Sequence, residues 1–354
     1  MLRGAGVLER GQVVDVAVDS TRETLISRIT RLRLTYDGGG AGPSHLFWKS
    51  QRDSTDPQRQ GFGRQEADFY RLVAADTPAG LLPRCYEASA EPGHPWHLAL
   101  EDLTASHEAP GEWPLPPSID RCHAVLEVHA PGVPVDQPHV AADPAGQHRV
   151  PEVSVAVHDG QVAVRAISFE QARGGRDEPL VALRALGGQA IAKTIGEGGQ
   201  VGRHGRQVPV ERPRLVERYR SHRDLTIVHG DAHFWNTMLP RRVGGDVRLI
   251  DWDAWRVDTA TADLAYMLAV HCYPDWRRRY ERDSLRRYHD ALVGHGVRGY
   301  PFEALWQDYR RSVLWQLGTP MWQANHNLPP WIWWNHLERV MRAIDDLDCL
   351  DLLD

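Results

Sequence analysis

The chain has 354 residues, of which 42% are hydrophobic and 25% charged, and its formal net charge is −6 at pH 7. These values are ordinary for a globular protein, and the length suggests two domains. The negative charge argues against binding of nucleic acid or anionic membrane through bulk electrostatics. The N-terminus is too polar for a signal peptide, and no run of about 18 apolar residues is present, so no transmembrane helix is expected.

The cysteines indicate the redox compartment. They are widely spaced, at Cys85, Cys122, Cys272 and Cys349, and form neither a CxxC pair nor a disulfide framework. This usage favours a reducing environment, and a cytoplasmic protein is expected.

The first third of the chain shows the alternation of apolar and polar residues that is typical of β-strands. Strands are expected at 13–18, 25–36, 45–49 and 98–100, and helical spacing predicts helices at 65–75 and 119–129. A polar turn at 19–24 joins the first two strands, and a glycine-rich turn at 37–43 precedes the third. The chain is therefore predicted to begin as an antiparallel meander.

Residues 131–210 differ from the rest of the chain, because Phe169 is their only aromatic residue. Glycine, proline and valine are frequent, and no helical period persists. One interpretation is a loop-rich insertion. The other is a stretch foreign to the original fold, for instance one produced by a compensated frameshift. Translating the gene in its other frames separates the two, because only the second predicts an aromatic-rich helical stretch there.

The last third begins with short apolar strands and continues as helices. Strands are expected at 225–228 and 247–250, and an apolar helix at 261–272 is followed by several more. Strands first and helices later indicate an α+β fold with two lobes. We expect residues 1–103 to form the N-terminal lobe and residues 104–354 the larger, mainly helical lobe.

Two polar clusters follow the strands of the last third. The first is His229-Gly230-Asp231-Ala232-His233-Phe234-Trp235-Asn236, and the second is Ile250-Asp251-Trp252-Asp253. Buried carboxylates are costly unless a ligand or metal compensates them. Phosphoryl transfer needs Mg²⁺ held by hard oxygen ligands and a carboxylate that orients the attacking hydroxyl. Asp231, Asn236 and Asp251 supply that set.

The clusters resemble the HGDxHxxN catalytic loop and the IDxD magnesium segment of the aminoglycoside phosphotransferase-like kinases, a superfamily that includes choline kinases and ecdysteroid kinases. The resemblance implies a two-lobed protein-kinase-like fold and transfer of the γ-phosphate of ATP or GTP to a hydroxyl of a small molecule. The fold would have a small antiparallel N-terminal sheet with one helix and a larger, mainly helical C-terminal lobe.

The same resemblance implies roles for individual residues. Asp231 would be the catalytic base, in a loop braced by His229 and His233. Mg²⁺ would be held by Asn236 and Asp251, with Asp253 as a further residue of the magnesium segment. Asp263, in the following helix, would brace the catalytic loop; the alternative for Asp263 is an ordinary exposed acid in a first helical turn.

A kinase-like fold also needs a strand lysine on the nucleotide phosphates, fixed by a helix glutamate. Lys49 ends a predicted strand and is the only lysine in the first half of the chain. Glu66 opens the next predicted helix, in a segment that resembles the family's E-x-x-F-Y start. We expect the two side chains to form an ion pair above Asp251.

The remaining nucleotide contacts are predicted from the hinge and the phosphate turn. Residues 98–103 resemble the family's hinge, where backbone groups bind adenine, so Glu101 and Leu103 are candidates. The turn at 19–24 departs from the family, since it has no glycine. The hydroxyls of Ser20 or Thr21 would replace part of the missing backbone contact.

Two other interpretations of the site remain open. His229, Asp231, His233 and Asp251 could bind zinc in a metallohydrolase, although Lys49 would then be unexplained. A kinase fold could also survive as a catalytically impaired binding or regulatory protein. The atypical segment beside the catalytic loop favours that alternative, for which binding of Mg·ATP without turnover would be diagnostic.

The C-terminal part is rich in aromatic residues, and Trp331, Trp333 and Trp334 are nearly consecutive. Such residues cannot all point inward on one helix. Some are therefore expected to line a pocket or an interface. In the superfamily these helices form the acceptor pocket, which implies a bulky, partly apolar alcohol or a cation held by cation–π contact. No nucleic-acid or membrane partner is predicted.

Overall fold

The structure is a computed structural model. It describes residues 1–24, 26–52, 63–91, 93–111, 117–128, 153–158, 161–166, 225–242 and 245–353. The chain divides into two compact units. Among the described residues, the first unit contains those up to 128 together with 157–158, 161–162 and 227–257. The second contains 153–156, 163–166, 225–226 and 258–353. Nearly all of the atypical segment 131–210 lies outside the described residues.

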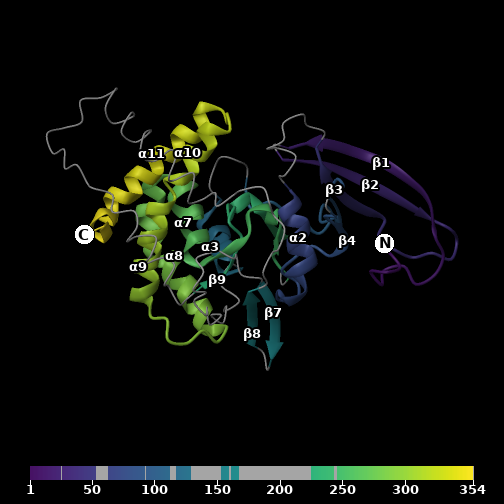
Figure 1. Ribbon diagram of the computed structural model, residues 1–354, viewed down its shortest axis with the longest axis horizontal. Coiled ribbons are helices and arrows are strands. Elements are labelled where there is room, and N and C mark those ends of the chain that lie inside the picture. The colour runs from purple at the N-terminus through teal and green to yellow at the C-terminus, as the bar shows by residue number, and fades with distance from the viewer. Residues whose placement is uncertain are drawn as a thin grey trace, which may run out of the picture. The chain divides into compact units, whose positions relative to one another are not determined.

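A five-stranded antiparallel sheet forms the N-terminal part of the first unit (Figure 1). Its strands, in spatial order, are β1 (Val13–Glu23), β2 (Ser27–Tyr36), β3 (His45–Gln51), β5 (His97–Glu101) and β4 (Cys85–Ser89). The predicted meander is thereby confirmed. Strands β1, β3 and β5 extend further than predicted, whereas β2 begins two residues later and β4 was not predicted.

The turn predicted at 19–24 is wrong. Ser20 pairs with Arg31, and Thr21 pairs with Thr30, so both lie within β1. The chain turns only after Glu23, where the Thr24 hydroxyl accepts hydrogen bonds from the following amides. Threonine has a good β-propensity, and cross-strand polar pairs stabilise a ladder as well as apolar ones do. The polar composition of the segment therefore gave no reliable sign of a turn.

Helix α2 (Arg64–Leu72) lies beside β4 and β5 and is followed by a 3-10 turn at Ala74–Asp76. Its apolar side packs in two places. Ala67 joins a cluster with Trp96 and Leu98 of the sheet, and Phe69 joins one with Leu249 and Trp252. The helix therefore connects the sheet to the later segment that carries the second polar cluster.

The rest of the first unit consists of short elements. They are β6 (His107–Glu108), α3 (Ile119–Val128), β10 (Thr237–Pro240) and β11 (Arg248–Leu249), with 3-10 turns at Phe234–Asn236 and Trp252–Ala254. Strands β11, β10 and β6 form a three-stranded sheet. Two further strands, β9 (Leu225–Val228) and β12 (Arg256–Thr259), carry the chain into and out of this unit. Strands β7 (Val153–His158) and β8 (Gln161–Ala166) pair with each other.

The second unit is helical. It contains α7 (Thr261–Ala265), α8 (Pro274–Gly294), α9 (Phe302–Trp315), α10 (Gly318–Asn325) and α11 (Pro330–Asp346), and ends in a 3-10 helix at Cys349–Leu353. The helix predicted at 261–272 changes to a π-helix at Tyr266–Val270. No helix in the described part of the chain is long and apolar enough to span a bilayer. Trp331 and Trp334 are 54% and 56% exposed, in agreement with the expectation that the tryptophans of this segment cannot all be buried.

A buried ion-pair network holds three helices of the second unit together. Arg277 of α8 is 1% exposed and donates to both carboxylate oxygens of Glu281, at 3.0 and 2.9 Å. The Tyr309 hydroxyl of α9 donates to Glu281 at 2.6 Å, and Asp346 of α11 accepts from Arg277. Because these groups lie away from water, each needs its partners.

We expect Glu281→Ala to lower the free energy of unfolding by about 3 kcal/mol, since it leaves the Arg277 cation buried without its main partner. Glu338→Ala is the matched control. Glu338 forms the same i,i+4 pair with Arg342, but both side chains are 51% exposed. Its loss should cost less than about 0.5 kcal/mol. Denaturant unfolding of both variants measures the difference, and equal losses would contradict the expectation.

Candidate active site

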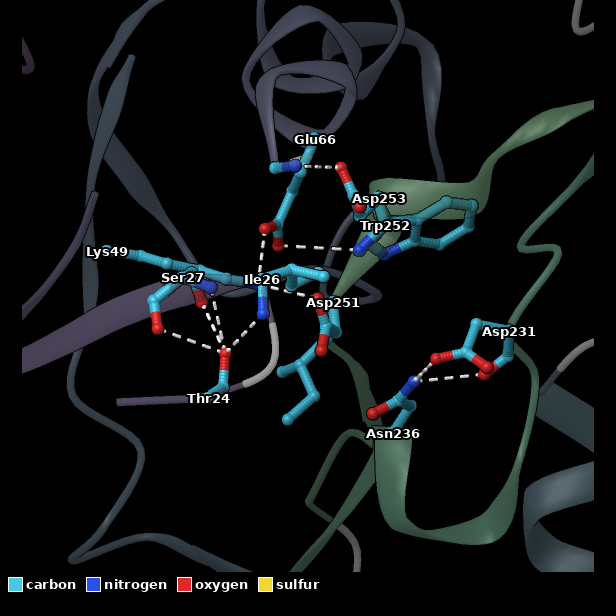
Figure 2. A network of polar contacts seen from close by, with 12 residues as sticks. Thr24, Ile26, Ser27, Lys49, Glu66, Asp231, Asn236, Asp251, Trp252 and Asp253 are labelled. Carbon is cyan, nitrogen blue, oxygen red and sulfur yellow. Dashed lines mark hydrogen bonds and ion pairs between the residues drawn. The ribbon is translucent and has the colours of Figure 1, made fainter. Parts of the chain in front are cut away.

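Lys49 lies at the centre of a buried ion-pair triad (Figure 2). Its Nζ atom is 2.5 Å from Glu66 Oε2 and 2.5 Å from Asp251 Oδ1. Strand pairing explains the position. Lys49 faces Leu98 across β3 and β5, so both side chains are on the same face of the sheet, and Leu98 packs against α2. The predicted ion pair of Lys49 with Glu66 is confirmed, and Asp251 joins it.

One cation serves two carboxylates in this triad. Burial lowers the pKa of Lys49, but the charges of Asp251 and Glu66 outweigh burial and hold the pKa above its usual range. Burial raises the pKa of Glu66 to about 7 against the charge of Lys49. Burial acts on Asp251 in the same direction, yet Lys49 outweighs it and keeps the pKa of Asp251 below its usual value. The Asp251 side chain is 35% exposed and that of Glu66 1%, so the more buried carboxylate is the harder one to ionise.

The catalytic-loop cluster starts where β9 ends. His229 is 1% exposed, and its Nε2 atom lies 2.8 Å from the carbonyl oxygen of Ile250. The Asp231 amide donates to His229 Nδ1 at 3.3 Å. The His229 ring therefore connects the two polar clusters. The role of His229 as a brace of the catalytic loop stays a prediction.

Gly230 allows the two clusters to approach closely. Its φ is 81°, and a Cβ atom there would lie 2.0 Å from the carbonyl oxygen of Ala254. Any other residue would therefore force the segments apart.

Asn236 connects Asp231 to the second cluster. Its Nδ2 atom donates to the backbone oxygen of Asp231 at 2.9 Å and to Oδ2 at 3.0 Å. The backbone carbonyl of Asn236 accepts from the Ile250 amide at 2.9 Å, which places Asn236 next to Asp251. His233 Nε2 lies 3.6 Å from Asp231 Oδ2. The five-residue spacing read from the sequence therefore brings the Asp231 and Asn236 side chains into direct contact.

The donor set fits a magnesium ion. The Nδ2 atom of the Asn236 side chain binds Asp231. The side-chain oxygen of Asn236 therefore points away from Asp231, and Figure 2 draws Asp251 on that side. Asp251 has φ 68° and ψ 59°, and only one of its carboxylate oxygens is within 2.5 Å of Lys49. A carboxylate and an amide oxygen are the hard ligands that Mg²⁺ prefers.

Asp253 contacts the start of α2. Its Oδ1 atom accepts a hydrogen bond from the Gly63 amide at 2.7 Å, at the N-terminus of α2. Burial raises the pKa of Asp253 to about 6. Its metal role stays a prediction.

The other predicted nucleotide contacts lie on separate elements. Ser20 and Thr21 are exposed residues of β1. Glu101 ends β5, and its Oε2 atom accepts from the Arg84 amide at 3.1 Å. Leu103 is buried, and its carbonyl accepts from the amides of the following turn. Their roles toward a nucleotide stay predictions.

Asp263 is 6% exposed in α7 of the second unit, so it is not the exposed helix acid of the alternative interpretation. Its bracing of the catalytic loop stays a prediction.

The sequence reasoning missed the aromatic and polar contacts that fix α2 to the second cluster. Trp252 stacks on Phe69 with ring centroids 4.1 Å apart, and the Trp255 Nε1 atom donates to the Gln65 carbonyl at 2.9 Å. It also missed the hinge contact of Arg31 Nε with Asp102 Oδ2 at 2.7 Å. The available signal was the two tryptophans that flank Asp253, since aromatic residues beside a buried acidic segment need a packing partner.

The alternative interpretation of the site was a zinc-binding metallohydrolase. Within the part of the chain that the structure describes, no group of three or more His, Cys, Asp or Glu side chains is arranged to hold a metal ion.

Comparison with solved structures supports the fold. A candidate aminoglycoside phosphotransferase from Ralstonia eutropha JMP134 is 14% identical, with 98% of this chain and 94% of that chain covered and a TM-score of 0.51. At that identity the likeness shows the fold alone. The chain has a protein-kinase-like fold. The predicted class, α+β with an antiparallel N-terminal sheet and a helical C-terminal region, is confirmed.

Two further solved structures are weaker likenesses, and one family model matches part of the chain. A choline/ethanolamine kinase family protein from Mesorhizobium loti is 12% identical over 94% of this chain and 87% of that chain, with a TM-score of 0.48. Plasmodium vivax ethanolamine kinase is 9% identical over 97% and 82%, with a TM-score of 0.49. The model of the ecdysteroid kinase-like family matches residues 209–297, which include both polar clusters. The resemblance stated from the motifs is thereby confirmed. No curated protein sequence matches the chain significantly.

Proposed function

We propose that the protein is a phosphotransferase that moves the γ-phosphate of ATP or GTP to a hydroxyl of a small molecule. The observation that carries the proposal is the triad in which one buried lysine contacts both Glu66 and Asp251. A kinase-like site needs this lysine charged and held, since it neutralises the nucleotide phosphates.

The first unit carries the parts that the reaction needs. Backbone groups of the hinge, including Glu101 and Leu103, would hold the adenine or guanine base. Asp102 supports that geometry because Arg31 and the Thr104 amide both donate to it, at 2.7 and 2.9 Å. Ser20 and Thr21 would lie over the phosphates.

Asn236 and Asp251 would hold Mg²⁺, and the ion would neutralise charge on the phosphates. Asp231 would orient the acceptor hydroxyl and take its proton as the oxygen bonds to the γ-phosphorus. The bond from that phosphorus to the β–γ bridging oxygen breaks, and the nucleoside diphosphate leaves. Asn236 holds the Asp231 carboxylate in place for this step. Asp263 would brace the loop.

The acceptor would be a small hydroxylated molecule that is bulky and partly apolar, or a cation. The exposed tryptophans of the helical unit, Trp322, Trp331 and Trp334, suit such a molecule.

A screen of hydroxylated small molecules for ADP release with Mg·ATP tests the function. Turnover with an acceptor, lost in Asp231→Asn, would support the proposal. Binding of Mg·ATP without turnover on any acceptor, together with no effect of Asp231→Asn on slow ATP hydrolysis, would favour a binding or regulatory protein instead.

Lys49→Met should raise the KM for ATP and lower turnover, by about 10² in kcat/KM, because the phosphates lose a fixed charge. Lys49→Arg should not restore activity, since a guanidinium fork is not an equivalent point charge between two carboxylates. Arg71→Met is the control, because Arg71 is a partly exposed cation of α2 that pairs with Asp68. Steady-state kinetics at varied ATP measures all three. Activity of Lys49→Met at the level of the control would contradict the role of Lys49.

A further inference from the structure

Helix α2 has no capping side chain of its own. Its N-cap residue is Gly63, which adopts φ 83° and has no side chain to bind the first helical amides. Such amides have no partner within the helix and need one from outside it. Gly63 cannot be exchanged for a capping residue, because a Cβ atom there would lie 1.9 Å from Trp96 Cζ2.

Asp253 supplies the missing cap from a segment far away in the sequence. Its Oδ1 atom accepts a hydrogen bond from the backbone N–H group of Gly63 at 2.7 Å. Gly63 is the N-cap residue, so a carboxylate from another element binds the amide at the start of α2.

The position of Glu66 follows from this arrangement. In a capping box the N3 glutamate folds back onto the N-cap amide. That amide is already bound by Asp253, so the Glu66 carboxylate is left for Lys49, 2.5 Å away. Its other oxygen accepts from the Trp252 amide at 3.4 Å, next to Asp253.

Further contacts fix the same end of α2 to the same segment. The Gln65 side chain donates to the Trp255 carbonyl, and the Trp255 indole donates back to the Gln65 carbonyl. Phe69 stacks on Trp252 with an angle of 6° between the rings. These contacts therefore fix the start of α2 to the segment that carries Asp253.

We propose that Asp253 is a positioning residue, which caps α2 and thereby holds the Glu66 carboxylate in contact with Lys49. The inference rests on the proposed function only for its effect on catalysis, since the cap itself is a property of the fold. It assigns Asp253 a role other than the metal ligand that its sequence segment implied.

Two substitutions in the full-length protein separate the roles. Asp253→Ala removes the cap, whereas Asp253→Asn keeps an oxygen that accepts from backbone amides and loses the charge that a metal ligand needs. Hydrogen exchange of the peptide covering residues 63–72 is measured without nucleotide, and KM for ATP, kcat and the Mg²⁺ titration midpoint are measured with it. Asp68→Asn is the control, because Asp68 is an acid of the same helix that pairs with Arg71.

We expect Asp253→Ala to speed exchange at the start of α2 by about fivefold to tenfold, the size expected for loss of a cap, and to raise KM for ATP by a similar factor. Asp253→Asn should restore both to within about threefold of the wild type, and the Mg²⁺ midpoint should not change in either variant. The control should match the wild type.

Unchanged exchange in Asp253→Ala would overturn the cap. A Mg²⁺ midpoint that rises in Asp253→Asn with exchange at the wild-type level would show a metal ligand instead. If Asp253→Ala does not fold, the Asn variant alone decides between these outcomes. If the wild type transfers no phosphate, the proposed function fails, while the exchange measurement still tests the cap.

Discussion

Asp231→Asn should lower the rate of phosphoryl transfer by about 10²–10⁴ while nucleotide affinity stays within about threefold of the wild type. The base acts on the acceptor hydroxyl rather than on the nucleotide, so its loss leaves the binding groups intact. The substitution also keeps an oxygen that can accept from Asn236 Nδ2, which donates to Asp231 at 3.0 Å, and so preserves the loop. Single-turnover transfer and an independent nucleotide titration measure the two effects.

The control for this variant is Asp246→Asn, an acid of the same unit whose side chain is 69% exposed. It should transfer phosphate at the wild-type rate. Turnover of Asp231→Asn at that same rate would show that Asp231 is not the base.

Asp251→Ala should weaken Mg²⁺-dependent nucleotide binding by roughly 10²–10³, as expected for removal of a partner from a buried charge cluster. The variant loses a proposed magnesium ligand and leaves Lys49 with Glu66 as its remaining carboxylate partner in the triad. Asn236→Ala should have a milder effect, because an amide contributes no charge. Isothermal titration of ATP at fixed Mg²⁺, and of Mg²⁺ at fixed ATP, measures both variants.

Thermal unfolding without nucleotide provides the check that each variant is folded. If Asn236→Ala weakens metal binding much more than Asp251→Ala, the two roles are reversed or wrong.

Local sequence patterns predicted the elements well where side-chain alternation and backbone structure agree. The strand at 225–228 and the start of the helix at Ile119 have the predicted bounds. The pattern failed at 19–24, where Ser20 and Thr21 read as a turn but extend β1. A polar residue in a ladder looks the same in sequence as a polar residue in a turn, and only the partner strand decides between them.

The candidate site shows the same division. Asp231 and Asn236 are five residues apart on one loop, so local geometry was enough to predict that both would serve the same site. Lys49 and Glu66 could be paired because a known family pattern links a strand lysine to a helix acid. The hydrogen-bond partner of Asp253 could not be predicted, because it depends on where the N-terminus of α2 lies after folding.

By itself, the sequence determined the fold class, the contact of Asp231 with Asn236 and the lysine that pairs with Glu66, since each is carried by a short segment or by a motif of fixed spacing. The tertiary structure alone decided that Asp251 contacts Lys49 directly, and that Asp253 binds the first amide of α2. The physical reason is that these contacts join residues about 190 to 200 positions apart, whose approach is set by the packing of Phe69 on Trp252 and by the room that Gly63 and Gly230 leave. No local pattern encodes such a distance.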